Sequence, residues 1–328
     1  MRPLDVDNRM DVSARFADFA HREAYGNSER YDTWCRAIAA DHDLCARIAA
    51  LPSHKQQPNL VLAATRYLGV VEVPPAEFLG WLRSNWDDIC REVLARSTQT
   101  NEPGRTAAIL PLLAQIEGPI ALIEVGASAG LCLYPDRYSH VYDDKVRLDP
   151  AAGPSTVVTR CTTTGDVPIP TVLPQIVSRS GVDLNPLDVA DLDHMRWLHA
   201  LIWPGQIERD ERLDAAAAIA RADPPMLVRG DLNERIEGLV DAVPDGVTAV
   251  VQHTAVLAYL DMAGRDRFFG QMSRLNARWI SFEGRGVFPQ IDRTIPERTQ
   301  HQENRFVLAL DGRARAFATA HGQRLHWL

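Results

Sequence analysis

Lysine is almost missing from this sequence. Of its 35 lysine and arginine residues, only Lys55 and Lys145 are lysines. The chain has no G-x-x-x-x-G-K segment, which excludes a nucleotide-triphosphate P-loop. A lysine that forms a Schiff base needs a desolvated pocket, and both lysines stand in polar stretches. Two broad kinds of enzyme chemistry are therefore disfavoured.

Long apolar runs and clustered basic charge are also missing. No apolar run approaches the roughly 20 residues that span a bilayer, and the charged beginning of the chain does not resemble a signal peptide. The formal net charge is −8, and the scattered basic residues disfavour a nucleic-acid partner. His194 and His199 stand outside any H-E-x-x-H motif, so we expect no metal site.

The cysteines have none of the patterns that predict disulfides or zinc. There are five of them, an odd number, and none forms a C-x-x-C pair. Reduced, mostly buried thiols are typical of cytoplasmic proteins, so we expect a cytoplasmic location.

The first third of the chain predicts helices only. Its length of 328 residues, 46% of them hydrophobic, allows one or two domains. Apolar residues recur every three to four positions in "VSARFADFAHREA", "YDTWCRAIAADHDLCARIAAL" and "PPAEFLGWLRSNWDDICREVL". We therefore predict an all-helical cap domain over residues 1–105.

From residue 117 onward the pattern changes to strands alternating with helices. The strand-like runs are "GPIALIEVG", "STVVTRCT", "PQIVSRSGVDL", "PPMLVRGDL", "GVTAVVQHT", "ARWISFEG" and "RFVLALDG". Alternation of this kind predicts a doubly wound, mostly parallel α/β sheet over residues 106–328. Paired runs around the "DG" and "HG" turns predict an antiparallel C-terminal edge.

The segment "IEVGASAGLCL", residues 123–133, reads as a buried strand, a small-residue turn and a helix-like stretch. It fits two different chemistries. "GASAG" matches the nucleophile elbow of α/β-hydrolases, with Ser128 as the nucleophile. The acidic-x-Gly-x-x-x-Gly spacing of Glu124, Gly126 and Gly130 also suits a turn that cradles S-adenosylmethionine, because small residues let backbone groups approach a ligand.

The surrounding sequence disfavours the hydrolase. An elbow follows a middle strand of the sheet, whereas the residues upstream of this turn are helical and contain no H-G-G-type loop. The triad would have to be completed by Asp231 or Asp311 with His321 or His326. A serine hydrolase that uses Ser128 remains an alternative.

Polar residues at successive strand ends favour the cofactor turn. In an open parallel sheet, ligands bind outside the carboxyl ends of the strands. The four strands after the turn end in residues suited to ribose, adenine and methyl transfer: Asp183 and Asn185, Gly230 and Asp231, Gln252 and His253, and Glu283. We expect His253 to be the general base, with Gln252 orienting the substrate and Glu283 as an alternative base.

These motifs resemble the class I S-adenosylmethionine-dependent methyltransferase fold. Nearly the whole chain, including "QTNEPGR", "GVDLNPLDV", "RWLHALIWPGQIERDERL" and "VVQHTAVLAYL", is similar to an uncharacterised bacterial domain-of-unknown-function family. The resemblance implies a Rossmann-like fold with S-adenosylmethionine as cofactor, bound by Glu124, Gly126, Ser128 and Gly130. The distance from Gly130 to Asp183 (183 − 130 = 53 residues) exceeds the usual ~20, which predicts an insertion at about 145–180.

Two further groups of residues are candidates for the site. Asn101 and Arg105 precede the first strand and could line the cofactor pocket, where a guanidinium suits the carboxylate of methionine; an N-cap is the alternative. Tyr134, Arg137 and Tyr138 could line the substrate side or form structural contacts. Because the cap and the insertion would close the pocket, we expect a small-molecule methyl acceptor. The runner-up is a non-catalytic descendant of the fold that binds a ligand or partner.

Replacing Ser128 separates the two chemistries of the turn. If the chain is a methyltransferase, Ser128→Ala binds S-adenosylhomocysteine nearly as well as the wild type, because the hydroxyl is not the reacting group. A serine hydrolase would lose all ester-cleaving activity in the same variant. Titration calorimetry and an esterase assay on both proteins distinguish the outcomes.

Overall fold

The computed structural model describes residues 11–99, 101–297 and 306–328. The chain forms two compact units. One is an α/β unit that contains residues 101–189 and 214–328, and the other is a helical unit that contains the preceding residues and 190–213.

The helices of the described residues are mostly short. The helical unit contains α1 (Val12–Phe19), a π-helical turn (Ala20–Ala24), α2 (Glu29–Ala39), α3 (His42–Ala49), α4 (Pro58–Tyr67), α5 (Pro75–Ser84), α6 (Trp86–Ala95) and α8 (Leu192–Leu201). The α/β unit contains α7 (Arg105–Leu113), α10 (Leu232–Asp241), α11 (Met262–Met272) and α12 (Pro289–Asp292). Helix α9 (Ile207–Ala222) begins in the helical unit and ends in the α/β unit.

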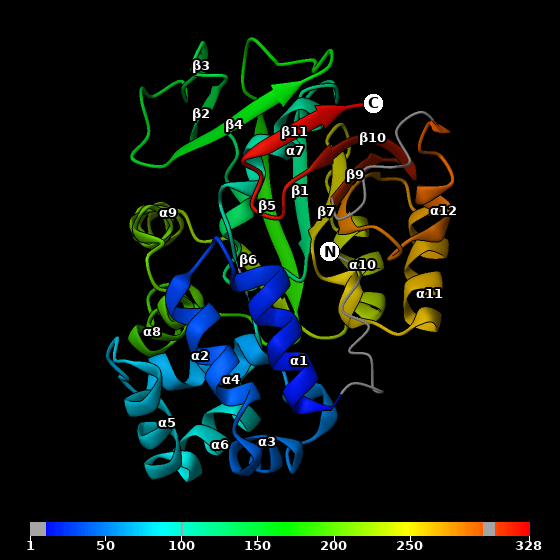
Figure 1. Cartoon of the computed structure of the whole chain (residues 1–328). Helices are drawn as coiled ribbons and strands as arrows, with labels where there is room; N and C mark the ends of the chain where they lie inside the picture. The colour runs from blue at the N-terminus through cyan, green and yellow to red at the C-terminus, as the bar shows by residue number, and fades with distance from the viewer. Residues whose placement is uncertain (1–10, 100, 298–305) are drawn as a thin grey trace. The chain divides into compact units, whose positions relative to one another are not determined.

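One mixed sheet organises the α/β unit (Figure 1). Its strands are β1 (Ile120–Val125), β2 (Ser139–Tyr142), β3 (Val146–Leu148), β4 (Val158–Thr164), β5 (Ile176–Asp183), β6 (Met226–Arg229), β7 (Thr248–Thr254), β8 (Arg278–Gly284), β9 (Phe306–Leu310), β10 (Arg313–Ala318) and β11 (Arg324–Trp327). The 11 strands lie in the order β3-β2-β4-β11-β10-β9-β8-β7-β1-β5-β6. The prediction of a large, mostly parallel α/β sheet is confirmed.

Strand β1 lies in the parallel half of the sheet, between β5 and β7. All six of its residues are buried, as its uninterrupted apolar run predicts for a strand covered on both faces. Strands β5 and β6 lie on one side of β1, and the chain then crosses to β7 and β8 on the other side. The direction of strand order therefore reverses at β1, which is where open α/β sheets bind ligands.

The apolar core lies on the face of the sheet that packs against α10, α11 and α12. Alternate residues of the central strands point into it, among them Ile123, Val125 and Val251. Helices α10 and α11 lie side by side, and α10 packs against β1 and β5 (Figure 1). Helix α10 is absent from our sequence-based expectations, although Asp231 caps its first turn by accepting a hydrogen bond from the Asn233 N–H.

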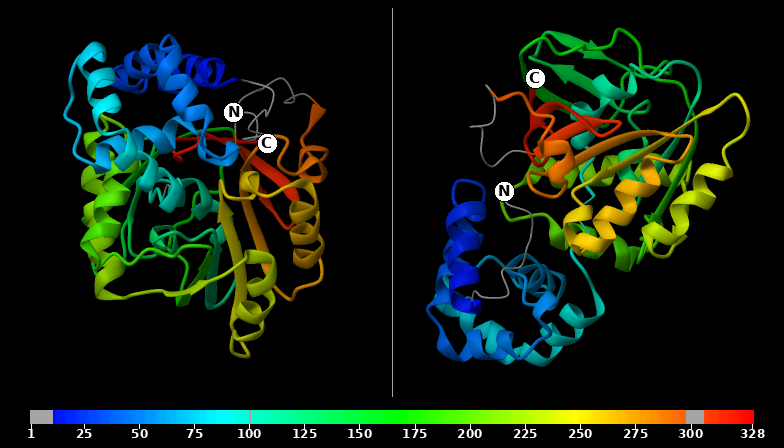
Figure 2. Two further views of the ribbon diagram at one scale, coloured as in Figure 1. Left: turned by 90° about the horizontal axis from the view of Figure 1, so that it is seen from below. Right: turned by 90° about the vertical axis from the view of Figure 1, so that its right-hand side faces the viewer.

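The C-terminal strands are antiparallel, as predicted, but they do not form the edge of the sheet. Strands β9 and β10 continue the sheet beyond β8, and β11 pairs in parallel with β4, so that β4, β2 and β3 extend the sheet further (Figure 2). The insertion predicted at about 145–180 therefore contributes strands to the far side of the sheet. The pairing of β4 with β11 provides hydrogen-bond partners for N–H and C=O groups of β11 that would otherwise lie at a sheet edge.

The helix expected after the glycine turn is also missing. A single 3-10 turn, Leu131–Leu133, follows Gly130, and the chain then enters β2. Pro135 has no N–H to continue a helix and disfavours helical geometry at the residue before it. Periodicity alone did not reveal this because residues 131–135 are all buried and apolar or aromatic.

Helix α7 is completed by a side chain from β2. Pro111 stands inside the helix, so the carbonyl of Ala107, four residues earlier, lacks its usual N–H partner. The hydroxyl of Tyr142 donates to this carbonyl at 2.7 Å. Both groups are buried, and the contact joins residues 35 positions apart.

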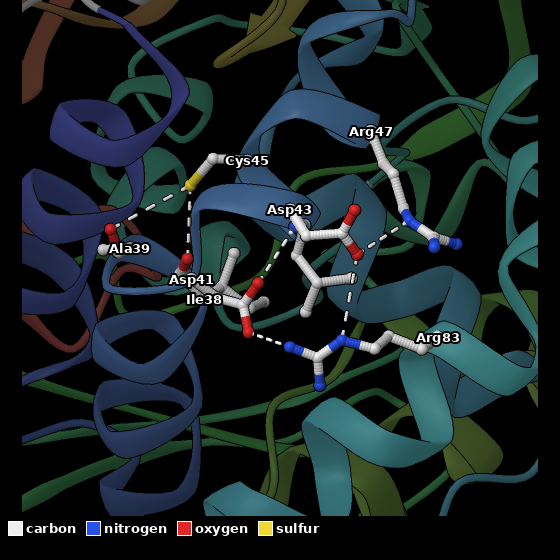
Figure 3. A network of polar contacts seen from close by, with 8 residues as sticks. Ile38, Ala39, Asp41, Asp43, Cys45, Arg47 and Arg83 are labelled. Atoms are coloured by element: carbon white, nitrogen blue, oxygen red, sulfur yellow. Dashed lines mark hydrogen bonds and ion pairs between the residues drawn. The ribbon is translucent and has the colours of Figure 1, made fainter.

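A stacked pair of aromatic rings and a group of ion pairs connect helices of the helical unit. The rings of Trp34 in α2 and Phe78 in α5 stack at 3.8 Å between centroids. At the start of α3, Asp41 caps the helix through the Leu44 N–H and also contacts Arg83 of α5 (Figure 3). Asp43 accepts from Arg47 at 3.0 Å and lies 3.8 Å from Arg83.

Residues 190–213, which we had grouped with the α/β part, belong to the helical unit. The two indole N–H groups of this segment donate to the unit's first part: Trp197 to the Ser97 carbonyl and Trp203 to the Asn59 side chain. These contacts link residues 100 and 144 positions apart, so local patterns could not show them. The five cysteines of the chain are free thiols, as expected.

Removing the Tyr142 hydroxyl should leave a buried carbonyl unpaired. We expect Tyr142→Phe to lower the free energy of unfolding by about 1–3 kcal/mol. In a Pro111→Ala background, which returns an N–H to the helix, the same substitution should cost about 1 kcal/mol less. Urea unfolding of the four proteins tests this; equal costs in both backgrounds would show that the hydroxyl does not replace the missing helix bond.

Candidate functional site

The glycine turn follows β1 and adopts left-handed backbone conformations. Gly126, Ser128 and Gly130 have φ angles of 69°, 51° and 73°. Glycine accepts such angles without strain, whereas Ser128 does so at a cost. Gly181 of β5 lets the turn approach closely, since a Cβ atom there would lie 2.6 Å from the Ala127 methyl group.

Backbone donors of the turn bind within the protein. The N–H groups of Gly126 and Ala127 both donate to the Val182 carbonyl, at 2.8 and 3.1 Å. The Gly130 N–H donates to the Ala127 carbonyl at 2.6 Å. The first two donors fix the turn against the end of β5 and the third closes the turn itself, so none of the three is directed to a ligand.

Asp183, the expected ribose acid, contacts the turn directly. One carboxylate oxygen accepts the Ser128 N–H at 2.9 Å and the other accepts the Asn185 N–H at 2.8 Å. The fold thus brings Asp183 to the glycine turn across the 55 residues that separate it from Ser128. Gly230 lies beside them, because its N–H donates to the Asp183 carbonyl at 3.0 Å.

Asp231 and Asn101, two further expected cofactor ligands, have structural contacts. Asp231 is the N-cap of α10. The Asn101 side chain binds the turn twice: its amide donates to the Ala127 carbonyl at 3.1 Å, and its oxygen accepts the Leu131 N–H at 2.6 Å. Asn101 therefore supports the turn from the side of the sheet that carries α7.

A buried polar cluster lies beneath the turn. Glu124 and Gln252 are opposite each other on β1 and β7, and both are fully buried. Gln252 donates to the Cys132 carbonyl at 2.9 Å. Both carboxyl oxygens of Glu124 and the amide oxygen of Gln252 have no hydrogen-bond partner of standard geometry. Three adjacent acceptors without donors are unusual in a folded core.

Burial controls the charge of Glu124. Removal from water raises the pKa of its carboxyl well above the ordinary value, and the nearby Arg105 guanidinium opposes part of the rise. Arg105 is itself buried and donates to both oxygens of Thr254, at 2.9 and 3.1 Å, and to the Ala320 carbonyl at 2.9 Å. This arginine therefore links the start of α7 to the ends of β7 and β10.

His253 lies on the opposite face of β7, inside the apolar core. Its Nδ1 is 2.7 Å from Glu283 Oε1, and its Nε2 is 2.9 Å from the indole Nε1 of Trp279. An indole N–H can only donate, so Nε2 accepts and Nδ1 carries the proton that Glu283 binds. The rings of Phe268 and Phe288 pack around the imidazole.

This geometry does not support the expected base role of His253. Both ring nitrogens are hydrogen-bonded to protein groups, and the side chain is fully buried. Glu283 Oε1 also accepts the N–H groups of Val256 and Leu257, at 3.0 and 3.1 Å. The pair therefore holds the turn after β7, a role that residue type and position alone did not reveal.

The three residues expected on the substrate side do not form a common surface. Tyr134 and Tyr138 are fully buried, and their hydroxyls donate to the Asp223 and Leu131 carbonyls. Arg137 is exposed and lies near Asp136 and Asp223. These contacts correspond to the structural alternative considered for this group.

Val256 is a residue of this region that sequence patterns did not single out. If Gly126 carried a Cβ atom, that atom would lie 2.3 Å from Val256 Cγ2. The valine side chain therefore covers the first glycine of the turn. Only its position two residues after β7, beside β1 in the sheet, could have indicated this contact.

Two kinds of feature are absent from the described part of the chain. No group of three or more histidine, cysteine, aspartate or glutamate side chains there is arranged to hold a metal ion. No helix there combines the length and the apolar character needed to cross a bilayer.

Comparison with known proteins identifies a family and no characterised relative. Residues 13–327 match the family model described as "Uncharacterized protein conserved in bacteria (DUF2332)". No curated protein and no solved structure matches the chain. The resemblance to the bacterial family is therefore confirmed, and the comparisons add no reaction to it.

The contact between Gly126 and Val256 predicts a stability difference between two glycines. Gly246 also has a positive φ, 80°, but has open space where a Cβ would stand. We expect Gly246→Ala to cost about 1 kcal/mol from backbone strain and Gly126→Ala a further 1–3 kcal/mol, roughly, from overpacking. Urea unfolding of the wild type and both variants measures these losses in the free energy of unfolding. Equal losses would mean that Val256 moves aside without cost.

Proposed function

The chain belongs to this family of uncharacterised bacterial proteins, and we propose that it is an S-adenosylmethionine-dependent methyltransferase that acts on a small molecule. The cofactor would bind at the carboxyl end of β1, over the glycine turn and beside Asp183. The finer assignment of the sheet to the class I methyltransferase fold is part of this proposal, as is a cytoplasmic location.

The contact between Asp183 and the turn carries the proposal. The acid at the end of β5 and the glycine turn after β1 meet although a long insertion separates them in sequence. They meet at the point where the strand order reverses, the usual ligand position in open α/β sheets. The order β6-β5-β1-β7-β8 supports the proposal because these five strands are parallel.

The polar groups fit the two ends of the cofactor. A carboxylate has about four lone-pair positions, so the Asp183 oxygens that accept backbone N–H groups can also accept ribose hydroxyls. The oxygens of Glu124 and the amide oxygen of Gln252 have no hydrogen-bond partner of standard geometry, and an ammonium group bound beside them would favour the charged form of Glu124. Arg105 lies close enough to affect the pKa of Glu124 and suits a carboxylate. The amino-acid end of S-adenosylmethionine carries both an ammonium group and a carboxylate.

The residues of the chain supply binding and orientation more readily than proton transfer. S-adenosylmethionine supplies the electrophilic methyl group when bound. The turn, Asp183 and the Glu124 cluster would fix its position, and proximity accounts for a large part of many enzymatic accelerations. Because His253 has no ring nitrogen to spare, the proposal assigns it a positioning role. The acceptor would then be a nucleophile that needs no general base, such as a carboxylate or a neutral amine.

A non-catalytic binding protein is the second candidate. Two observations favour it: Val256 covers Gly126, and the strand-end histidine is bound within the core. The same turn would then bind a nucleoside-containing ligand without methyl transfer. The hydrolase alternative receives less support, because neither an elbow helix nor upstream strands accompany Ser128 among the described residues.

Titration calorimetry with S-adenosylhomocysteine tests the proposal. We expect a dissociation constant of about 1 μM, which corresponds to about −8 kcal/mol. Gly126→Arg should abolish binding, because its side chain meets Val256 and the turn. Gly246→Arg, at a glycine of similar φ with open space around it, should bind like the wild type.

The absence of binding in the folded wild-type protein would contradict the cofactor assignment. Binding without labelled methyl transfer from S-adenosylmethionine to pooled carboxylate and amine metabolites would favour the non-catalytic candidate. A serine-reactive probe that labels the wild type and not Ser128→Ala would instead favour the serine hydrolase.

A further inference from the structure

We propose that the turn after β7, residues 255–258, is a gate over the glycine turn and that Val256 closes it. The inference rests on the proposed function, because it concerns access to the same cofactor site. In the closed state, Val256 lies against Gly126 and would block the approach of a ligand to this glycine from the β7 side.

The contact with Gly126 is direct and extensive for one side chain. A Cβ atom on Gly126 would lie 2.3, 2.6 and 2.9 Å from three atoms of Val256. The valine therefore fills the place that a side chain of Gly126 would take. Its own other side is half-exposed, so moving it outward would not require the core to open.

Glu283 holds the gate shut from inside the core. Its Oε1 accepts the N–H groups of Val256 and Leu257 as well as the imidazole of His253. The second oxygen, Oε2, is buried without a partner. One carboxylate oxygen thus anchors two consecutive residues of the turn to β7 and β8, and Trp279 fixes the imidazole in turn.

The backbone of the gate stores strain that favours movement. Ala255, at the start of the turn, has a φ of 59°, a left-handed conformation that is costly for alanine. Arg265 of α11 donates to the carbonyls of Leu257 and Ala258, at 3.0 and 2.9 Å. The turn is therefore strained at its first residue and restrained at the others, as expected of a segment with a second arrangement.

A closed gate lowers the apparent affinity for the cofactor. When only a fraction of the molecules is open, the apparent dissociation constant equals the intrinsic one divided by that fraction. A variant that cannot close should therefore bind more tightly and associate faster. A side chain with a merely structural role would change stability and leave the association rate unaltered.

The test compares Val256→Ala with the wild type and with Val243→Ala. Val243 is a matched control, since it is also a half-buried valine packed against the same core. We measure association rates and affinities for S-adenosylhomocysteine by stopped-flow fluorescence and calorimetry. Val256→Ala should raise both by about tenfold, and Val243→Ala should leave both unchanged.

The outcomes separate the gate from the proposed function. Equal rates and affinities in all three proteins would overturn the gate and leave the cofactor site intact. Tighter and faster binding by Val256→Ala than by the wild type and Val243→Ala would support the gate. If none of the folded proteins binds, the proposed function fails, and the gate as a control of cofactor access fails with it.

A ligand-free measurement tests the anchor independently. Glu283→Gln weakens the acceptor that Val256 and Leu257 share, because a neutral amide oxygen is a poorer acceptor than a carboxylate. Hydrogen exchange of these two amides should then accelerate at least tenfold, while amides of β1 keep their protection. Unchanged exchange at residues 256 and 257 would overturn the role of Glu283 as the anchor.

Discussion

The burial of β1 is the constraint on which the rest of the α/β unit depends. All six residues of this strand are buried, and its backbone pairs with β5 on one side and β7 on the other. The glycine turn begins where this strand ends, so its position is fixed by two neighbouring strands. The acid at the end of β5 and the turn after β7 are then brought to it from both sides.

Burial also explains the unusual chemistry around the turn. Glu124 is as fully buried as the apolar residues before it in β1, and its complete removal from water raises the pKa of its carboxyl. On the opposite face of β7, His253 is enclosed by aromatic rings and bound through both nitrogens. Both groups were candidates for the site on sequence grounds, but their hydrogen bonding differs. The oxygens of Glu124 have no partner of standard geometry, whereas both ring nitrogens of His253 are hydrogen-bonded to protein groups.

The sequence predicted the main strands because a buried strand is a local signal. Continuous apolar runs located β1, β7 and β8, and turn residues located the C-terminal hairpins. Strands β2 and β3 were missed because they are short, of four and three residues, and β3 lies within an insertion that we treated as a unit. The pairing of β11 with β4 was missed because parallel partners distant in sequence leave no local pattern.

By itself, the sequence determined which residues stand at the strand ends, the permissive glycines of the turn, and the absence of a P-loop lysine. Only the tertiary structure decided which of those residues remain available for chemistry. It joined Asp183 to Ser128, paired His253 with Glu283 and Trp279, and placed Val256 over Gly126. The reason is physical: a residue's type fixes what it can donate or accept, whereas its partners are fixed by packing between segments far apart in the chain.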